Sequence, residues 1–127
     1  MEVAISQGRI LELTVTSDEL SAIRQCLNEV CNGYEVKDFV LKIGVDEKTA
    51  LRLLDATSRH NPAKVAPAGG DKFRVSFTPE EARIVVNAMT ETLTGGGVGA
   101  YEYFARIGAE TAEIEVMRSS IQSALAT

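Results

Sequence analysis

Hydrophobic and polar residues alternate along two short segments of the chain, residues 11–15 and 73–77. Strict alternation is typical of a β-strand that buries one side and exposes the other. Each segment therefore predicts a short strand, and the second strand follows the first at a shift of 62 positions. The hydrophobic positions of the two strands are Leu11, Leu13, Val15, Phe73, Val75 and Phe77.

The same local pattern marks a helix start after each strand. Thr16 precedes Glu19 by three positions, and Thr78 precedes Glu81 by three. Such pairs form capping boxes, because the threonine hydroxyl accepts a hydrogen bond from the glutamate N–H and the glutamate carboxylate accepts one from the threonine N–H. Hydrophobic residues follow at three- and four-residue spacing, which predicts one buried face for each helix. They are Leu20, Ile23, Leu27, Val30, Cys31, Ile84, Val85, Ala88, Met89 and Leu93.

Both long helices are predicted to end at glycines, Gly33 and Gly95, in left-handed C-terminal caps. The second copy then has two extra residues, and the match resumes in predicted short helices, where Lys42 corresponds to Arg106. The segments that follow have acidic starts and carry hydrophobic residues at helical spacing, which predicts a closing helix in each copy. The predicted closing helices cover residues 46–57 and 110–124.

Residues 60–71 separate the two copies and contain two prolines and two glycines. This composition predicts a connector that forms no helix or strand of its own. Near the start of the chain, Val3 and Ile5 precede Ser6-Gln7-Gly8, which predicts an additional strand that folds back as a hairpin onto residues 9–15.

The pattern as a whole predicts a helix-rich α+β fold in one domain, residues 1–127, made of two repeats. Repeat one covers residues 9–57, a connector covers 58–70, and repeat two covers 71–124. Each copy alone is too small to cover its hydrophobic face, so we expect a shared core around a pseudo-twofold axis, with the two strands paired antiparallel. A two-stranded ribbon is marginally stable, so we also expect helices or a second subunit to shield its edges.

The 127 residues include 18 acidic and 13 basic side chains, which gives a formal net charge of -5. An acidic chain lacks a face that neutralises phosphates, so we expect no nucleic-acid partner and favour a basic protein. No hydrophobic run is long enough to cross a bilayer, and the first residues lack the pattern of an export signal, so we expect no membrane partner and a cytoplasmic location. Cys26 and Cys31 lie on different flanks of one helix, which predicts two buried, unpaired cysteines.

The sequence contains no complete catalytic or cofactor motif. Residues 95–100 match G-x-G-x-x-A, but they follow a helix, whereas a dinucleotide-binding loop connects a strand to a helix. We therefore predict an enlarged, flexible turn at this place and no cofactor. His60 is the single histidine, and no serine lies in a G-x-S-x-G pattern, so we expect neither a catalytic triad nor a histidine metal site. The prediction is a protein without enzymatic activity.

Acidic residues dominate the second copy and lie next to aromatic residues between positions 95 and 115. Most acidic side chains on helices are simply solvated, but aromatic side chains with charged neighbours are typical of protein-binding hot spots. Tyr103 or Phe104 takes the place of Phe39 in the first copy, so at least one of these rings is expected in the core. The predicted partner-binding residues are Gly96, Gly97, Tyr101, Glu102, Glu110 and Glu113.

A sequence pattern in the first copy carries a family resemblance. Its residues are Leu27-Asn28-Glu29-Val30-Cys31-Asn32-Gly33, Asp38-Phe39, Lys42-Ile43-Gly44 and the helix from Asp46 to Leu54. The first copy thereby resembles small bacterial proteins that share an LNEVxNG…EF…R-x-G…LL pattern, whereas residues 90–95 of the second copy depart from it. Small, acidic, stand-alone proteins of this kind look like immunity proteins. The resemblance implies a toxin as the partner.

The combined interpretation is a non-enzymatic α+β binding protein, most concretely an acidic inhibitor that masks the basic surface of a toxin or an enzyme. Two alternatives stay open. One is a homo-oligomeric structural or regulatory adaptor, such as a homodimer. The other is a small-molecule-binding protein or enzyme whose site lies between the two repeats.

Overall fold

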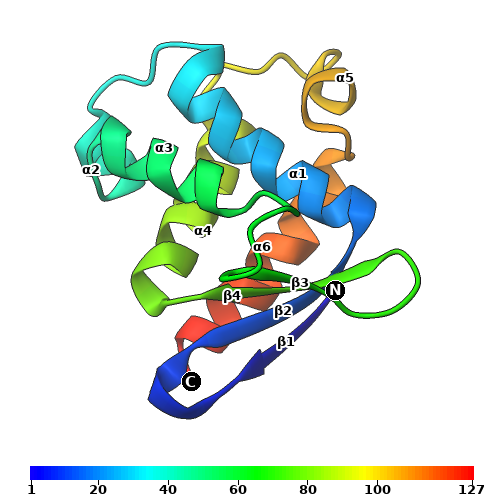
Figure 1. Cartoon of the computed structure of the whole chain (residues 1–127). Coiled ribbons are helices and arrows are strands. Elements are labelled where there is room, and N and C mark those ends of the chain that lie inside the picture. Colours follow the sequence, from blue (N-terminus) through cyan, green and yellow to red (C-terminus); the bar gives the residue numbers. More distant parts are fainter.

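The computed structural model describes residues 1–127 and contains six α-helices and a four-stranded antiparallel sheet (Figure 1), which confirms the predicted helix-rich α+β class. A 3-10 turn (Gln7–Arg9) connects the first two strands, and a π-helical turn (Glu29–Gly33) continues the first helix. The strands are β1 (Glu2–Ile5), β2 (Leu11–Thr16), β3 (Val65–Pro67) and β4 (Lys72–Phe77). The helices are α1 (Ser17–Asn28), α2 (Phe39–Ile43), α3 (Glu47–Ala56), α4 (Pro79–Thr94), α5 (Tyr103–Ile107) and α6 (Thr111–Leu125).

The two predicted strands form the centre of the sheet. β2 and β4 pair antiparallel, from Leu11 opposite Phe77 to Thr16 opposite Lys72. β1 pairs with the other edge of β2 as the predicted hairpin, and β3 pairs with the other edge of β4, so the order is β1-β2-β4-β3. Phe73 is half-buried, and the other predicted inward-facing residues are at most 2% exposed. They are Leu11, Leu13, Val15, Val75 and Phe77.

The connector contains a strand, so its prediction as a segment without helix or strand is wrong. In β3, Val65 lies opposite Val75 and is 2% exposed. Three residues are too few to show an alternating pattern, and proline occurs in strands mainly on an edge, where a missing N–H is tolerated. The expectation that helices or a second subunit shield the edges of a two-stranded ribbon is also wrong, because the predicted hairpin strand β1 covers one edge and β3 covers the other.

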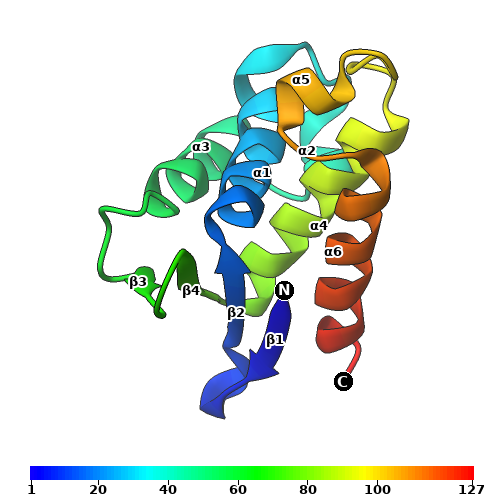
Figure 2. The same cartoon turned by 90° about the vertical axis from the view of Figure 1, so that its right-hand side faces the viewer.

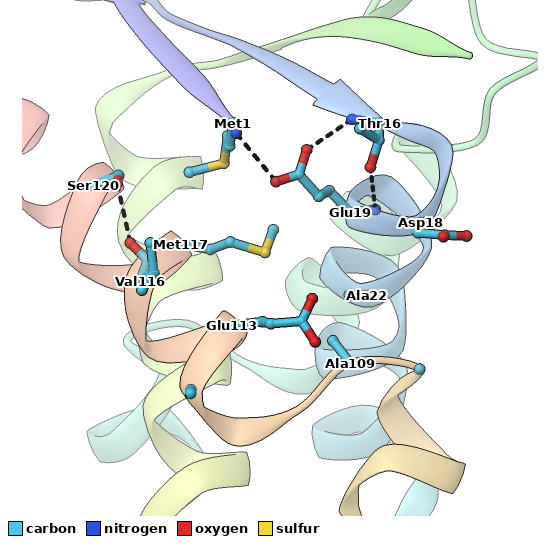
Figure 3. Close-up of a pocket in the computed structure, with 12 residues that line it drawn as sticks. Met1, Thr16, Asp18, Glu19, Ala22, Ala109, Glu113, Val116, Met117 and Ser120 are labelled. Atoms are coloured by element: carbon cyan, nitrogen blue, oxygen red, sulfur yellow. Dashed lines mark hydrogen bonds and ion pairs between the residues drawn. The ribbon is translucent and has the colours of Figure 1, made fainter.

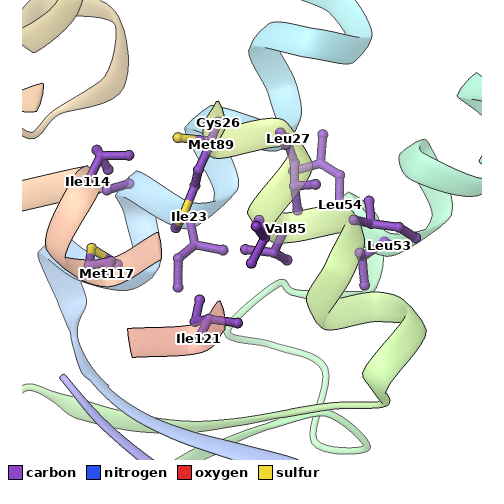
Figure 4. Packing of buried hydrophobic residues seen from close by; sticks show 14 of the residues in the cluster. Ile23, Cys26, Leu27, Leu53, Leu54, Val85, Met89, Ile114, Met117 and Ile121 are labelled. Atoms are coloured by element: carbon purple, nitrogen blue, oxygen red, sulfur yellow. The ribbon is translucent and has the colours of Figure 1, made fainter. Parts of the chain in front are cut away.

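The helices gather on one side of the sheet around a single cluster of 31 buried hydrophobic residues (Figures 1, 2 and 4). The long helices α1 and α4 contact each other, α3 packs against α1, and α6 packs against α4. Each short helix packs against the long helix of the other half, since α2 contacts α4 and α5 contacts α1.

Both predicted capping boxes are present. At the start of α1, Thr16 Oγ1 accepts a hydrogen bond from Glu19 N at 3.1 Å, and Thr16 N donates to Glu19 Oε1 at 2.8 Å. The corresponding distances between Thr78 and Glu81 at the start of α4 are 3.2 Å and 2.9 Å. The closing helices are also confirmed as α3 and α6.

The predicted left-handed caps at Gly33 and Gly95 are wrong. Neither glycine has a positive φ, and φ of Gly95 is -76°. A Cβ at Gly33 would overlap the Glu29 carboxylate, and one at Gly95 would overlap both the carboxylate and the backbone oxygen of Glu91, so a larger residue at either position would have to displace these groups. The left-handed glycines cap the two short helices instead. They are Gly44, with φ of 95°, and Gly108, with φ of 84°.

The order strand, long helix, short helix and closing helix occurs in residues 9–57, the first half, and again in residues 71–124, the second half. That order is the one predicted for a tandem repeat. The twofold relation between the two halves stays a prediction, and a superposition of the backbones of the two halves tests it.

Candidate functional site

The glycine-rich loop after α4 is partly engaged inside the protein. Gly96 is exposed with φ of +79°, and a Cβ at this position would have no heavy atom within 4 Å. Gly97 packs against Tyr34, because a Cβ there would overlap the aromatic ring. Gly97 thus makes an internal contact, and a partner can reach this loop more directly at Gly96.

The aromatic residues at positions 101–104 divide between surface and core. Tyr101 is fully exposed and Phe104 is 57% exposed. Tyr103 is 3% exposed, and its hydroxyl lies 3.0 Å from Thr92 Oγ1, so Tyr103 supplies the core ring that the sequence led us to expect. Glu102 is exposed beside Tyr101 and lies 3.7 Å from an Arg106 nitrogen.

A cavity of about 540 Å³ lies between the first turns of α1 and the N-terminal part of α6 (Figure 3). Organic ligands occupy pockets of about 300–1,000 Å³, so this cavity has room for a small organic group. Both halves of the chain contribute walls. The apolar lining consists of Met1, Ala22, Ala109, Ala112, Val116 and Met117. The carboxylates of the lining are those of Asp18, Glu19 and Glu113.

Glu19 is held at one side of the cavity by two contacts. The Thr16 N–H donates to Glu19 Oε1, and the α-ammonium group of Met1 lies 3.2 Å from Glu19 Oε2. Burial raises the pKa of Glu19, but the hydrogen bonds from Thr16 and the nearby ammonium group lower it by more, so its pKa lies below the ordinary value. Glu19 is therefore ionised at neutral pH and already paired with a cation.

Glu113 faces the same cavity from α6 and has no ion-pair partner. Its Oε1 accepts a hydrogen bond from the Glu110 N–H at 3.1 Å, within the capping box that starts α6. Figure 3 shows the Glu113 carboxylate directed across the cavity toward α1, whereas the Asp18 carboxylate points away from it. The structure thus places two predicted residues, Glu110 and Glu113, side by side, and only Glu113 lines the cavity.

The cavity has a negative charge surplus. Its lining includes three carboxylates and no lysine, arginine or histidine, and the ammonium group of Met1 offsets one of the charges. Because the Asp18 carboxylate points away from the cavity, Glu113 is the carboxylate inside it that no cation offsets, and the N-terminus of α6 adds only about half a positive charge beside it. The capping boxes of α1 and α6 also occupy N–H groups that an anion would need. The cavity therefore favours a cationic group.

Two buried glutamates form a second polar centre, at the end of α1 and α4 away from the sheet (Figure 1). Glu29 is 5% exposed and accepts two hydrogen bonds from Arg106, at 2.5 Å and 2.9 Å. Glu91 is 7% exposed, and its Oε1 lies 4.0 Å from Lys42 Nζ. Each glutamate belongs to one half and its cation to the short helix of the other half. These pairs therefore tie the two halves together.

A chain of buried polar groups lies close to this centre. Cys26 Sγ lies 3.8 Å from Thr92 Oγ1, which in turn lies 3.0 Å from the Tyr103 hydroxyl. Burial raises the pKa of Cys26 to about 11, so the thiol is protonated at neutral pH. A buried, protonated thiol is a poor nucleophile. Cys31 is likewise free and buried, as predicted, and we assign the two cysteines to the core.

The structure shows no group of three or more histidine, cysteine, aspartate or glutamate side chains that could hold a metal ion. His60 is exposed in the segment after α3, where its backbone N–H donates to Ser58 Oγ at 3.2 Å. A second pocket, of about 230 Å³, is lined by Arg24, Gln25, Asn28 and Leu54, and the cavity between α1 and α6 has more room for a ligand.

Sequence reasoning found Glu113 but not its surroundings. The sequence predicts only a capping role for Glu19, and it places Met117 only within the closing helix of residues 110–124. The available signal was that both α1 and α6 start with acidic residues. That the two helix starts converge is set by tertiary packing, which a single sequence does not reveal.

Comparison with protein-family models, curated proteins and solved structures gives no match. None of the helices combines the length and the hydrophobicity needed to cross a membrane. The functional assignment therefore depends on the geometry and charge of the surface.

Proposed function

We propose that the protein is a non-enzymatic binding module whose partner is a basic protein, such as a toxin or an enzyme whose surface it masks. The observation that supports this proposal is the exposed surface of the segment from Tyr101 to Val116, which we call the acidic face; it covers the turn before α5, α5 itself and the N-terminal part of α6. This surface exposes apolar side chains among carboxylates. Its residues are Tyr101, Glu102, Phe104, Glu110, Glu113, Glu115 and Val116.

Three large side chains on the acidic face can anchor a partner. Tyr101 is fully exposed, Phe104 is 57% exposed and Val116 is 67% exposed. Large aromatic side chains surrounded by polar neighbours contribute much of the binding free energy in protein interfaces, because they lose a large hydrated area on contact. Their exposure within one segment of the chain supports a binding role for that segment.

The charge of the acidic face supports a basic partner. Its charged residues are glutamates, and one of them, Glu102, has an arginine nearby, because Arg106 Nη1 lies 3.7 Å from Glu102 Oε2. Arg106 is engaged by Glu29, and Arg118 directs Nη1 to Thr90 Oγ1 on α4 at 3.3 Å. A surface of one sign raises the association rate with a partner of the opposite sign, especially at low salt. The resemblance of residues 27–54 to immunity-like bacterial proteins supports the same class of partner.

Affinity capture from the native host, followed by binding measurements with the purified partner, tests the proposal. We expect the wild-type protein to retain a basic protein, with an association rate that falls as salt concentration rises. The double variant Tyr101→Ala, Phe104→Ala should lose this binding. Leu41→Ala is the matched control, because it removes an apolar side chain that is 83% exposed on α2, outside the acidic face.

Two results would contradict the proposal. One is that no basic protein is retained by the wild-type chain under any salt condition. The other is that Leu41→Ala weakens binding as much as the double variant does, because binding would then not depend on the acidic face.

A small-molecule-binding protein is the second candidate, and the observation that favours it is the cavity with walls from both halves. A thermal-shift screen with metabolites and nucleotides tests it. A ligand that binds only the folded state stabilises the protein by about 2.7 kcal/mol at a concentration one hundred times its dissociation constant, which is readily detected.

A further inference from the structure

We infer that the cavity between α1 and α6 is a subsite for one cationic side chain of the partner, a lysine or an arginine. Its aliphatic stem would lie on the apolar wall, and its charged head would pair with Glu113. The inference rests on the proposed function for the kind of partner, and on the cavity itself for the chemistry of the occupant.

The apolar wall suits an aliphatic stem. Ala22 is 1% exposed, Met117 is 4% exposed and Ala109 is 6% exposed, so these side chains form the interior side of the cavity. Two of the three are alanines, whose small side chains leave the volume open. Lysine and arginine bury their methylene groups along apolar surfaces while the charged end stays in a polar environment. The wall therefore matches the stem of such a side chain.

The polar wall selects the charge of the head. The Met1 ammonium group, 3.2 Å from Glu19, shows that an ammonium group fits beside a carboxylate in this cavity. Glu113 has no such partner and is directed across the cavity (Figure 3). An anion would be repelled by Glu113, and a neutral apolar group would desolvate Glu113 without replacing its water. A cation is the occupant that compensates Glu113.

Continuity with the acidic face indicates that the cation comes from a protein. Val116 lines the cavity and is also 67% exposed on the acidic face, so the cavity opens beside the surface proposed to hold the partner. Glu113 belongs to the same two surfaces. A side chain that projects from a partner seated on the acidic face can therefore enter the cavity without a rearrangement of the helices.

Two small probes test the chemistry of the cavity without the partner. Pentylammonium mimics a lysine stem and head, and pentan-1-ol is its neutral counterpart. In methyl-detected NMR titrations, pentylammonium should shift the Met117 and Ala22 methyl signals in a saturable manner, with a millimolar dissociation constant. Pentan-1-ol should bind more weakly.

Two isosteric variants test the role of Glu113. Glu113→Gln keeps an oxygen that caps α6 but removes the charge, and it should raise the dissociation constant for pentylammonium about fivefold. Asp18→Asn removes the same formal charge from a carboxylate that points away from the cavity, and it should change the constant less than about twofold. The pair separates a direct contact from a general effect of net charge.

Several outcomes would overturn the inference. They are equal binding of pentan-1-ol and pentylammonium, equal effects of Asp18→Asn and Glu113→Gln, and the absence of a saturable shift at Met117. A micromolar dissociation constant for pentylammonium would also overturn it, because the natural occupant would then be a free amine.

A cavity-filling variant separates this inference from the proposed function. Ala112 is exposed and lines the cavity, so Ala112→Leu fills space without crowding the core. If the captured partner binds this variant and the wild-type chain equally, the subsite is wrong and the binding-module proposal stands. If no partner is found but pentylammonium binds as expected, the proposed function fails and the cavity chemistry stands.

Discussion

Because Gly33 and Gly95 have no side chain, they leave room for the carboxylates of the two buried glutamates, Glu29 and Glu91. A Cβ at Gly33 would overlap Glu29 Oε2, the oxygen that accepts a hydrogen bond from Arg106. A Cβ at Gly95 would overlap the Glu91 carboxylate. Neither glycine is needed for a left-handed backbone, so each of them provides the space that lets a carboxylate fold back over the helix end.

Gly33→Ala should therefore destabilise the protein by about 1–2 kcal/mol, within the range observed for overpacked positions. The physical reason is that the new methyl group displaces Glu29 from Arg106. Urea denaturation measures the change. Gly99→Ala is the matched control, because Gly99 has no positive φ and a Cβ there meets no heavy atom within 4 Å.

A double-mutant cycle identifies the cause of that loss. In a Glu29→Ala background the carboxylate is gone, so Gly33→Ala should cost little. An undiminished cost in that background would show that the backbone conformation, and not the carboxylate, requires glycine at this position.

The sequence could not distinguish these uses of glycine. A glycine after a helix reads as a left-handed cap, which is correct for Gly44 and Gly108 and wrong for Gly33 and Gly95. Glu91 was grouped with acidic side chains that are mostly solvated, yet it is 7% exposed. A retrospective signal exists, because the repeat aligns Glu29 with Glu91 and Lys42 with Arg106.

At the scale of elements, the starts of α1 and α4 depend on capping hydrogen bonds that could be predicted from the sequence. Thr78→Ala removes the hydroxyl that accepts from Glu81 N at 3.2 Å, and it should lower the free energy of unfolding by about 1 kcal/mol. Thr78→Ser keeps the hydroxyl and should recover most of the loss. Denaturation at neutral pH checks both variants. A serine variant as unstable as the alanine variant would assign the effect to the threonine methyl group.

Local patterns predicted the elements whose hydrophobic residues are periodic and whose ends carry caps. This applies to β2 and β4, to both long helices and to both closing helices. It fails for β3, because a three-residue edge strand has no period and depends on β4 for its hydrogen bonds. A short strand that forms only because a neighbouring strand pairs with it is difficult to predict from a single sequence.

At the scale of the whole molecule, two ion pairs connect the two halves, and they differ in distance and in burial. Arg106→Ala leaves Glu29 buried without its cation, whereas Lys42 is 43% exposed and 4.0 Å from Glu91. We expect Lys42→Ala to lower the free energy of unfolding by at most about 1 kcal/mol, and Arg106→Ala to lower it by clearly more. Thermal and urea denaturation rank the two. Equal losses would contradict the unequal roles assigned to these pairs.

The cavity and the acidic face show a similar limit at this scale. Exposed aromatic and acidic residues of one segment were visible in the sequence, so Tyr101, Glu102 and Glu113 could be selected as candidates. The sequence did not show which of these residues line a cavity. The cavity requires α1 and α6 to converge with Met1 between them, and no local pattern encodes that arrangement.

The central pairing of β2 with β4 also affects folding of the chain during its synthesis on the ribosome. Leu11 pairs with Phe77, so a ribosome has finished β2 long before it starts β4. At synthesis rates of about 5–20 residues per second, the nascent first half waits for seconds with the buried side of β2 uncovered. Chaperones that bind exposed apolar segments have that interval to act. Synonymous codons that slow translation between the two strands should lengthen it and raise the yield of misfolded chains.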